Sequence, residues 1–315
     1  LYANGALAGT TRVEAYAVSS KPISTAYPIQ YGSFDVSDDS SVIAYSFTHP
    51  STSAKCLAVE GGSLSDTAMF CLPSVFVSGR ISISPDKNLV AYEGLSFADY
   101  RTYLYVADLQ AHMASRLTAI SGGERFPTWS PDSSRLAYAA TRQYASVLAS
   151  CSLSTREEQV LARFEGAELA SPVWLDQASV AVVANYYDTP SRIVRVDTAT
   201  SGIVDLAASL WFADGLALSA DGTLLAAVGV EAEGARLMLV DTASGSLAFP
   251  VSDGAPRSSP VFSPDGSQLA VLANGQLELH ELDAGTRTLL GVVAVDRVDL
   301  EVAGGVGAHD RDLGQ

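Results

Sequence analysis

The amino-acid sequence predicts an all-β fold, a β-propeller of four-stranded blades. Three observations support this: a segment that recurs at a nearly constant interval, a tight-turn motif inside each copy, and no convincing helical period. In each copy an apolar pair precedes a serine, a turn rich in Pro, Asp and Gly, and an apolar strand that contains alanine. The motif position, a serine in all copies but one, is occupied by Ser37, Ser84, Ser130, Leu175, Ser219 and Ser263.

The interval between copies indicates the architecture. Successive motif positions lie 47, 46, 45, 44 and 44 residues apart. A period of about 40–45 residues that carries four short strands is typical of a propeller blade.

Each repeat reads as four strands joined by two kinds of hairpin. In Ser263-Pro264-Asp265-Gly266, proline fixes φ, aspartate hydrogen-bonds the backbone and glycine accepts a positive φ, so a tight turn joins the first two strands. About ten residues after the second strand begins, an alternating strand ends in an Asp-x-x-x-Gly turn, as at Asp241 and Gly245. This turn joins the third strand to the fourth.

The repeats predict one domain over residues 1–302. The marked repeats lie near residues 34–80, 81–126, 127–171, 172–214, 215–258 and 259–291. We expect residues 10–33 and 292–302 to form a composite closing blade, which leaves the ring without a free edge and favours seven blades. Six blades, with one end strand merely overlapping, is the alternative. Residues 303–315 are Gly-rich and polar and are expected to form a flexible tail.

The turn motif resembles that of a known family. Ser130-Pro131-Asp132 and Ser263-Pro264-Asp265-Gly266, each before a Leu-Ala strand, resemble the WD40-like (PD40) repeat of TolB-like β-propellers. The resemblance covers roughly residues 34–290 and implies the fold but no particular function. The remaining residues are too few for the α/β domain that TolB carries before its propeller, so the partners of TolB are not carried over.

Composition excludes several classes of partner. The chain has 315 residues, with 19 Lys and Arg against 35 Asp and Glu, and a net charge of −16. Its few lysines are scattered, so neither nucleic acid nor an anionic lipid surface is an expected partner. No apolar run approaches the ~18 residues of a transmembrane segment.

Two of the three cysteines are expected to form a disulfide. A hairpin that turns around Gly61-Gly62-Ser63 places Cys56 opposite Cys71. A disulfide there indicates an oxidising compartment, and a pair of buried thiols is the alternative. Because the chain begins at Leu1, we expect a removed signal peptide and a periplasmic or extracellular location. Cys151 is expected to be a buried free thiol.

The sequence offers no recognisable catalytic or metal-binding set. Its four histidines share no ligand spacing, and there is neither a Gly-x-Ser-x-Gly elbow nor a phosphate-binding Gly-x-x-x-x-Gly-Lys loop. Asp38 and Asp39 belong to a turn of the repeat, which explains them without a metal. We therefore expect no cofactor, and a structural calcium ion in the central channel is the alternative.

Candidate partner-binding residues lie on one face of the ring. The connections between second and third strands, and the crossings between blades, vary in sequence and carry Tyr, Trp and Arg, which are enriched at interface hot spots. The candidates are Tyr100, Arg101, Arg142, Tyr144, Tyr186, Tyr187, Arg125, Trp211 and Arg257. The alternative is that these tyrosines pack between blades and the arginines pair with the surplus acids.

Together these features favour a non-catalytic, exported propeller that binds a protein, as a scaffold or an accessory subunit of an envelope or extracellular assembly. The alternative is a propeller enzyme or carbohydrate binder that uses the central channel, with or without a metal.

Overall fold

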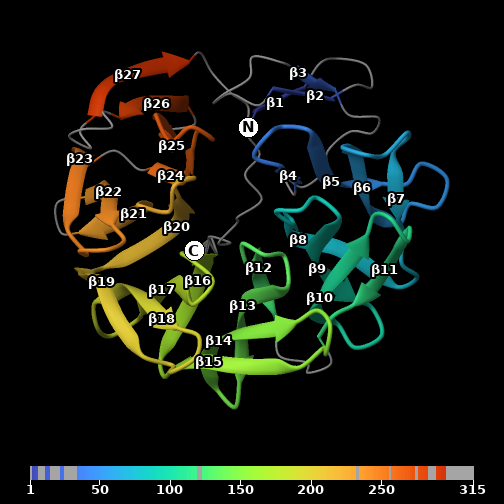
Figure 1. Cartoon of the computed structure of the whole chain (residues 1–315), viewed down its shortest axis with the longest axis horizontal. Helices are drawn as coiled ribbons and strands as arrows, with labels where there is room; N and C mark the ends of the chain where they lie inside the picture. Colours follow the sequence, from blue (N-terminus) through green and yellow to red (C-terminus); the bar gives the residue numbers. More distant parts are fainter. Residues whose placement is uncertain are drawn as a thin grey trace, which may run out of the picture.

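The described chain forms seven antiparallel sheets, of which six have four strands each. The structure is a computed structural model that describes residues 2–5, 11–14, 22–24, 34–118, 123–231, 234–254, 257–273, 276–282 and 289–295. The six four-stranded sheets follow one another around a ring in sequence order (Figure 1). The first strand of each lies nearest the centre and the fourth lies outermost. This arrangement is a β-propeller, as the sequence predicts, and we number these sheets as blades 1–6.

The strands of each blade are neighbours in sequence order. Blade 1 comprises β4 (Phe34–Val36), β5 (Val42–Thr48), β6 (Lys55–Gly61) and β7 (Ala68–Phe70). Blade 2 comprises β8 (Val75–Ile83), β9 (Leu89–Ser96), β10 (Arg101–Asp108) and β11 (Met113–Arg116). Blade 3 comprises β12 (Arg125–Trp129), β13 (Arg135–Arg142), β14 (Ala145–Ser152) and β15 (Glu158–Phe164).

The second half of the ring repeats the pattern. Blade 4 comprises β16 (Ala167–Trp174), β17 (Ser179–Tyr186), β18 (Ser191–Asp197) and β19 (Ile203–Leu210). Blade 5 comprises β20 (Phe212–Leu218), β21 (Leu224–Glu231), β22 (Gly234–Asp241) and β23 (Leu247–Gly254). Blade 6 comprises β24 (Arg257–Phe262), β25 (Gln268–Ala273), β26 (Gln276–Leu282) and β27 (Leu289–Val295).

The seventh sheet is N-terminal and has three strands, β1 (Tyr2–Gly5), β2 (Thr11–Glu14) and β3 (Pro22–Ser24). In Figure 1 it is drawn in the sector between β27 and β5. Residues 292–295 belong to β27, which pairs with β26 and completes blade 6. Residues 296–302 and the tail 303–315 lie outside the described residues, so the composite closing blade, and with it the blade count, stays a prediction.

The inner strands begin earlier than the repeat boundaries predict, because five of them carry a β-bulge. The ladder between the first two strands shifts register once per blade from blade 2 to blade 6, for example between Val77 and Ile81 in β8. Phe126, Ser171 and Gly215, at this position in blades 3 to 5, have φ of 58°, 48° and 65°. The bulge lengthens and bends each inner strand where it passes toward the next blade.

The Ser-Asp turns hold the first two strands of five blades in one geometry. In blade 3 the Ser130 hydroxyl donates to Asp132 Oδ1 (2.6 Å) and accepts from the Arg135 amide (2.9 Å). Asp132 Oδ1 also accepts from the Ser134 amide (3.1 Å) and hydroxyl (2.8 Å). Equivalent serine–aspartate bonds begin at Ser37, Ser84, Ser219 and Ser263. The predicted turn chemistry is therefore present.

The hydrophobic core lies between blades. Separate clusters of buried side chains lie between each successive pair of blades from 1 to 6. Two tryptophans add inter-blade hydrogen bonds. Trp129 Nε1 of blade 3 donates to the Ser82 carbonyl of blade 2 (2.9 Å). In the same way, Trp174 Nε1 of blade 4 donates to the Thr128 carbonyl of blade 3 (3.2 Å).

The predicted cysteine pair forms a disulfide. β6 pairs with β7 in the register Leu57 to Phe70, which brings Cys56 and Cys71 together with a Cα–Cα distance of 4.6 Å. Cys151, the third cysteine, is free and buried in β14. Within the described ranges, no helical segment has the length and hydropathy that a membrane span requires.

The disulfide should stabilise blade 1. Replacing both Cys56 and Cys71 with alanine opens a loop of sequence separation 15, which should lower the free energy of unfolding by about 3 kcal/mol. Urea denaturation measures this loss. The matched control is Cys151→Ser, which keeps the disulfide and should retain the parent protein's sensitivity to reductant. An unfolding midpoint of the parent protein that dithiothreitol leaves unchanged would contradict the prediction.

Candidate functional site

The connections of every blade alternate between two faces of the ring, because its four strands are antiparallel. We call the face with the first-to-second and third-to-fourth turns the turn face. The opposite loop face carries the second-to-third connections and the crossings to the next blade. Connections on the loop face vary in composition, so this is where blade-specific side chains are displayed.

Large aromatic side chains are exposed on the loop face. Six such side chains are exposed in the part of the chain that the structure describes: Phe97, Tyr100, Tyr144, Tyr187, Trp211 and Phe212. All six lie in second-to-third connections or at blade crossings, on blades 2 to 5. The exposed methionine and aliphatic side chains, by contrast, lie on outer strands or on the inner strand β24.

Two of these tyrosines have left-handed backbone conformations. Gln143 and Tyr144 have φ of 50° and 68° and form the two-residue turn between β13 and β14, closed by the pair Arg142–Ala145. Turns of this kind favour Asn and Gly, and a bulky residue there is strained. Tyr100 has φ of 55° at the end of the β9–β10 connection. Both rings point into solvent, with exposed fractions of 102% and 77%, so burial does not offset the strain.

On blade 2 the exposed rings form a cluster. The Phe97 ring centroid lies 6.5 Å from that of Tyr100 and 6.2 Å from that of Phe76. Lys55 Nζ, from blade 1, lies 3.9 Å from the Phe76 centroid. The cluster is thus a preformed apolar surface with one cation at its edge.

Adjacent tyrosines of blade 4 have different environments. Tyr187 is 85% exposed. Tyr186 packs against the buried cluster between blades 3 and 4, and its hydroxyl accepts from Arg192 Nη2 (2.9 Å). Tyr186 therefore packs between blades, as the alternative interpretation of the tyrosines expects. Tyr187 is available to a partner.

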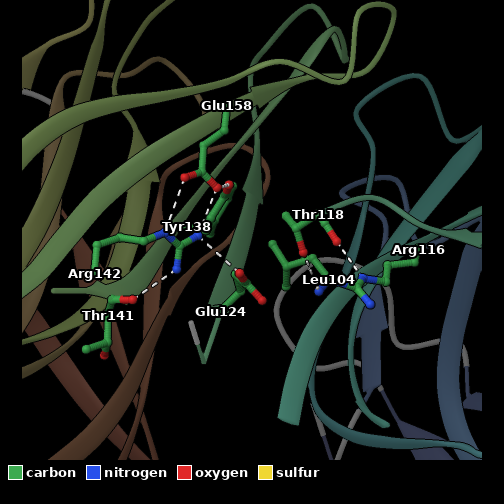
Figure 2. Close-up of polar contacts among 8 residues, drawn as sticks. All are labelled: Leu104, Arg116, Thr118, Glu124, Tyr138, Thr141, Arg142 and Glu158. Atoms are coloured by element: carbon green, nitrogen blue, oxygen red, sulfur yellow. Dashed lines mark hydrogen bonds and ion pairs between the residues drawn. The ribbon is translucent and has the colours of Figure 1, made fainter. Parts of the chain in front are cut away.

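Arg142 is held in a mostly buried ionic network (Figure 2). Its Nη2 lies 2.9 Å from Glu158 Oε2 and 3.1 Å from Glu124 Oε1, and the Tyr138 hydroxyl donates to Glu158. The exposed fraction of the side chain is 11% for Arg142 and 0% for Glu124. Burial raises the pKa of Glu124, and Arg142 opposes that shift. Arg142 thus stabilises the crossing into blade 3 and is little accessible to a partner.

The other candidates divide by exposure. Arg101, Arg125 and Trp211 are exposed on the loop face. Arg257 begins β24, and its side chain lies outside the described residues. Of the nine candidates, the structure brings Arg125 and Tyr187 to the rim of one cavity.

This cavity lies on the loop face between blades 3 and 4 and has a volume of about 350 Å³. Its floor includes Ala139, Ala167 and Leu169, which are buried, and the hydroxyl of Ser146 donates to the Ala167 carbonyl (2.6 Å). Arg125, Glu168 and Tyr187 also line it, and all three are exposed. We call this cavity the 3–4 slot.

The equivalent space between blades 2 and 3 is filled. Glu93, 8% exposed, lies over Gly79 of its own blade, where an added Cβ would be 2.0 Å from Glu93 Oε2. Its Oε1 accepts from the Phe126 amide in the bulge of blade 3 (2.8 Å). Burial raises the pKa of Glu93, while amide hydrogen bonds and nearby arginines lower it. This carboxylate ties two blades together where the 3–4 slot is open.

Asp35 and Asp39, two acidic residues at the first Ser-Asp turn, have structural partners. Asp39 accepts from Ser37, Ser41 and Lys87, and these bonds hold the pKa of its carboxyl far below the usual range. Asp35 Oδ2 accepts from the Ile83 amide of blade 2 (2.7 Å). Over the described ranges, no three His, Cys, Asp or Glu side chains are grouped as metal ligands.

Sequence reasoning placed Phe97 and Phe212 in loop-face connections without choosing them as partner-binding candidates, and it missed Glu168. A repeat alignment contains the signal for the slot, because Ala139 occupies the position of Glu93, two residues after the repeat alanine. The exposure of Phe97 and Phe212 has no such signal, since phenylalanine in a strand-rich sequence is ordinarily core.

No protein-family model matches the sequence, and the search of curated proteins finds no match. Solved structures do match. TolB from Acinetobacter baumannii superposes with a TM-score of 0.57 at 20% identity, covering 83% of this chain and 65% of TolB. This chain has a TolB-like β-propeller fold. The assignment of its repeats to the PD40 type remains a prediction.

Enzymes share the TolB-like fold. An oligogalacturonate lyase in complex with manganese has a TM-score of 0.65 at 14% identity, covering 93% of this chain and 87% of the lyase. A prolyl endopeptidase has a TM-score of 0.64 at 16% identity, covering 84% of this chain and 43% of the peptidase. The chain thus spans less than two thirds of TolB and under half of the peptidase. Such distant likeness shows the fold alone, and this fold serves both binding and catalysis.

Removing Arg142 should destabilise the protein strongly. Arg142→Met leaves the fully buried Glu124 carboxylate without its cation, which should lower the free energy of unfolding by about 3 kcal/mol. Glu124→Gln should cost less, because Arg142 keeps Glu158. Arg163→Met, at an exposed pair, serves as the control and should cost less than about 1 kcal/mol. Equal losses for Arg142→Met and Arg163→Met in urea denaturation would contradict the network's role.

The turn-face aspartates should confer acid sensitivity. Hydrogen bonds from Ser130 and Ser134 lower the pKa of Asp132 to about 2, below the unfolded value of about 3.9. Its stabilising contribution is therefore present above about pH 4 and is lost as the pH falls toward 2. Asp132→Asn and Ser130→Ala should each show a shallower fall in unfolding free energy over this window. Acid denaturation curves that run parallel to that of the parent protein would refute this.

Proposed function

We propose that this chain is a non-catalytic, exported protein-binding propeller whose loop face docks a protein partner in an envelope or extracellular assembly. The observation that carries the proposal is the confinement of the exposed aromatic side chains, over the described residues, to the loop face of blades 2 to 5. Tyr and Trp supply large contact area at small entropic cost and dominate interface hot spots.

The backbone of the loop face supports the same proposal. Tyr100 and Tyr144 occupy left-handed positions that glycine or asparagine would fill with less strain. Neither ring is buried, so folding alone gives no reason for tyrosine at these positions. Strain of this kind gathers at functional sites.

Export is supported by the Cys56–Cys71 disulfide, since such bonds persist in oxidising compartments. The non-catalytic part rests on the sequence, which offers neither a nucleophile–base motif nor a metal-ligand spacing.

Stability and binding should change in opposite directions at these tyrosines. Tyr100→Gly and Tyr144→Gly should raise the melting temperature, because glycine adopts a positive φ without strain. Combined with Tyr187→Ala, they should reduce capture of the native partner from the envelope and secreted fraction at least tenfold, as measured by quantitative mass spectrometry.

The control for this experiment replaces exposed side chains elsewhere on the protein. Met69→Ala, Met113→Ala and Val204→Ala remove side chains on outer strands and should leave capture unchanged. Capture that survives the tyrosine changes, or that both sets reduce alike, would overturn the loop-face proposal.

A further inference from the structure

The 3–4 slot exists because one position of the repeat is filled differently in successive blades. Two residues after the repeat alanine, blade 2 has Glu93, blade 3 has Ala139, blade 4 has Val183 and blade 5 has Val228. The alanine and valine side chains belong to the buried clusters that face the following blade. Alanine is smaller than glutamate or valine, and the 3–4 slot lies over it, at the height where Glu93 lies between blades 2 and 3.

The size and floor of the slot suit a small organic molecule. Ligand pockets begin at about 300 Å³ and combine apolar walls with a few polar groups. The slot has about 350 Å³, small apolar side chains on its floor and the exposed Tyr187 ring at its rim. Tyr187 can cover an apolar group that enters from the loop face.

The two charged residues at the slot define the complementary charges of the ligand. Arg125 and Glu168 both line it and are exposed, and Arg125 also lies close enough to Glu93 to lower the pKa of that carboxyl. An exposed guanidinium can bind a carboxylate, and an exposed carboxylate can bind an ammonium group. The space between blades 2 and 3 already holds a carboxylate, that of Glu93, and so provides a precedent for the carboxylate of the ligand.

We propose that the 3–4 slot binds a small zwitterion of the amino-acid class, a free amino acid or a short peptide, with an apolar side chain. The carboxylate faces Arg125, the ammonium faces Glu168, and the side chain lies over Ala139, Ala167 and Leu169. This site is separate from the docking of a protein partner, and only Tyr187 belongs to both.

Isothermal titration calorimetry with defined probes tests the proposal. L-phenylalanine and L-leucyl-L-phenylalanine carry both charges at different separations, so the tighter binder distinguishes a free amino acid from a peptide. Two analogues each lack one charge, 3-phenylpropionate and 2-phenylethylamine, and should bind at least about tenfold more weakly than the better zwitterion.

Variants assign the binding to the slot. Arg125→Gln and Glu168→Gln should each raise the Kd for the zwitterion about tenfold or more. Ala139→Val installs the residue that blades 4 and 5 have at this position, so it should fill the slot, keep the melting temperature and abolish binding. Arg195→Gln and Glu157→Gln, on the turn face, are the charge-matched controls and should leave the Kd unchanged.

Three results would overturn the proposal. The first is no binding of either zwitterion at about 10 mM probe, on the order of the weakest affinity worth assigning. The second is an analogue with one charge that binds as tightly as the better zwitterion, and the third is an Ala139→Val variant that binds the zwitterion as tightly as the parent protein. If Ala139→Val does not fold, the surface variants Arg125→Gln and Glu168→Gln decide alone. Partner capture by Ala139→Val should equal that of the parent protein, so failure of this proposal and failure of the protein-binding proposal are distinguishable.

Discussion

The serine hydroxyl at the start of each Ser-Asp turn sets the register on which the rest of a blade depends. It donates to an aspartate two residues later and accepts from the amide five residues later, as Ser84 does with Asp86 and Leu89. These bonds fix where the second strand begins relative to the first. Side chains alternate across a strand, so a slip of one residue would exchange every inter-blade contact for its opposite. In the five blades that carry it, the repeated turn therefore presents the same set of positions to the next blade.

A fixed register lets single substitutions change the space between blades without changing the fold. At the position of Glu93, a carboxylate joins two blades through the Phe126 amide, whereas valines in later blades fill the gap with apolar contact. Alanine in blade 3 contributes to the buried cluster between blades 3 and 4 but is smaller than either. The blades remain joined there by other means, including the hydrogen bond from Trp174 to the Thr128 carbonyl. The ring thus tolerates an open slot because neighbouring contacts are redundant.

The repeat arithmetic was sufficient to predict the propeller, the order of strands and the Cys56–Cys71 pairing, because turn chemistry and strand alternation are local properties. It did not predict which loop-face residues are accessible. Tyr186 and Tyr187 are neighbours in one connection, yet one packs inward against Arg192 and the other is exposed. Arg142 is of a residue type that is enriched at hot spots, but it is held by Glu124 and Glu158, which lie 18 and 16 residues away in sequence. Such outcomes depend on tertiary contacts that no local pattern records.

Tyr100 and Tyr144, the two strained tyrosines, are the residues on which the proposed binding by this rigid ring depends. A left-handed bulky residue costs about 1–2 kcal/mol in the backbone, and an exposed ring gains little from burial in the free protein. Asparagine or glycine at Tyr144 would remove the first cost and leave the ladder between β13 and β14 intact. The free protein therefore gains nothing from Tyr144 that a turn residue would not supply. A second molecule that buried the ring, held at a fixed position by the blade beneath it, would provide the missing gain without any ordering of the loop on binding.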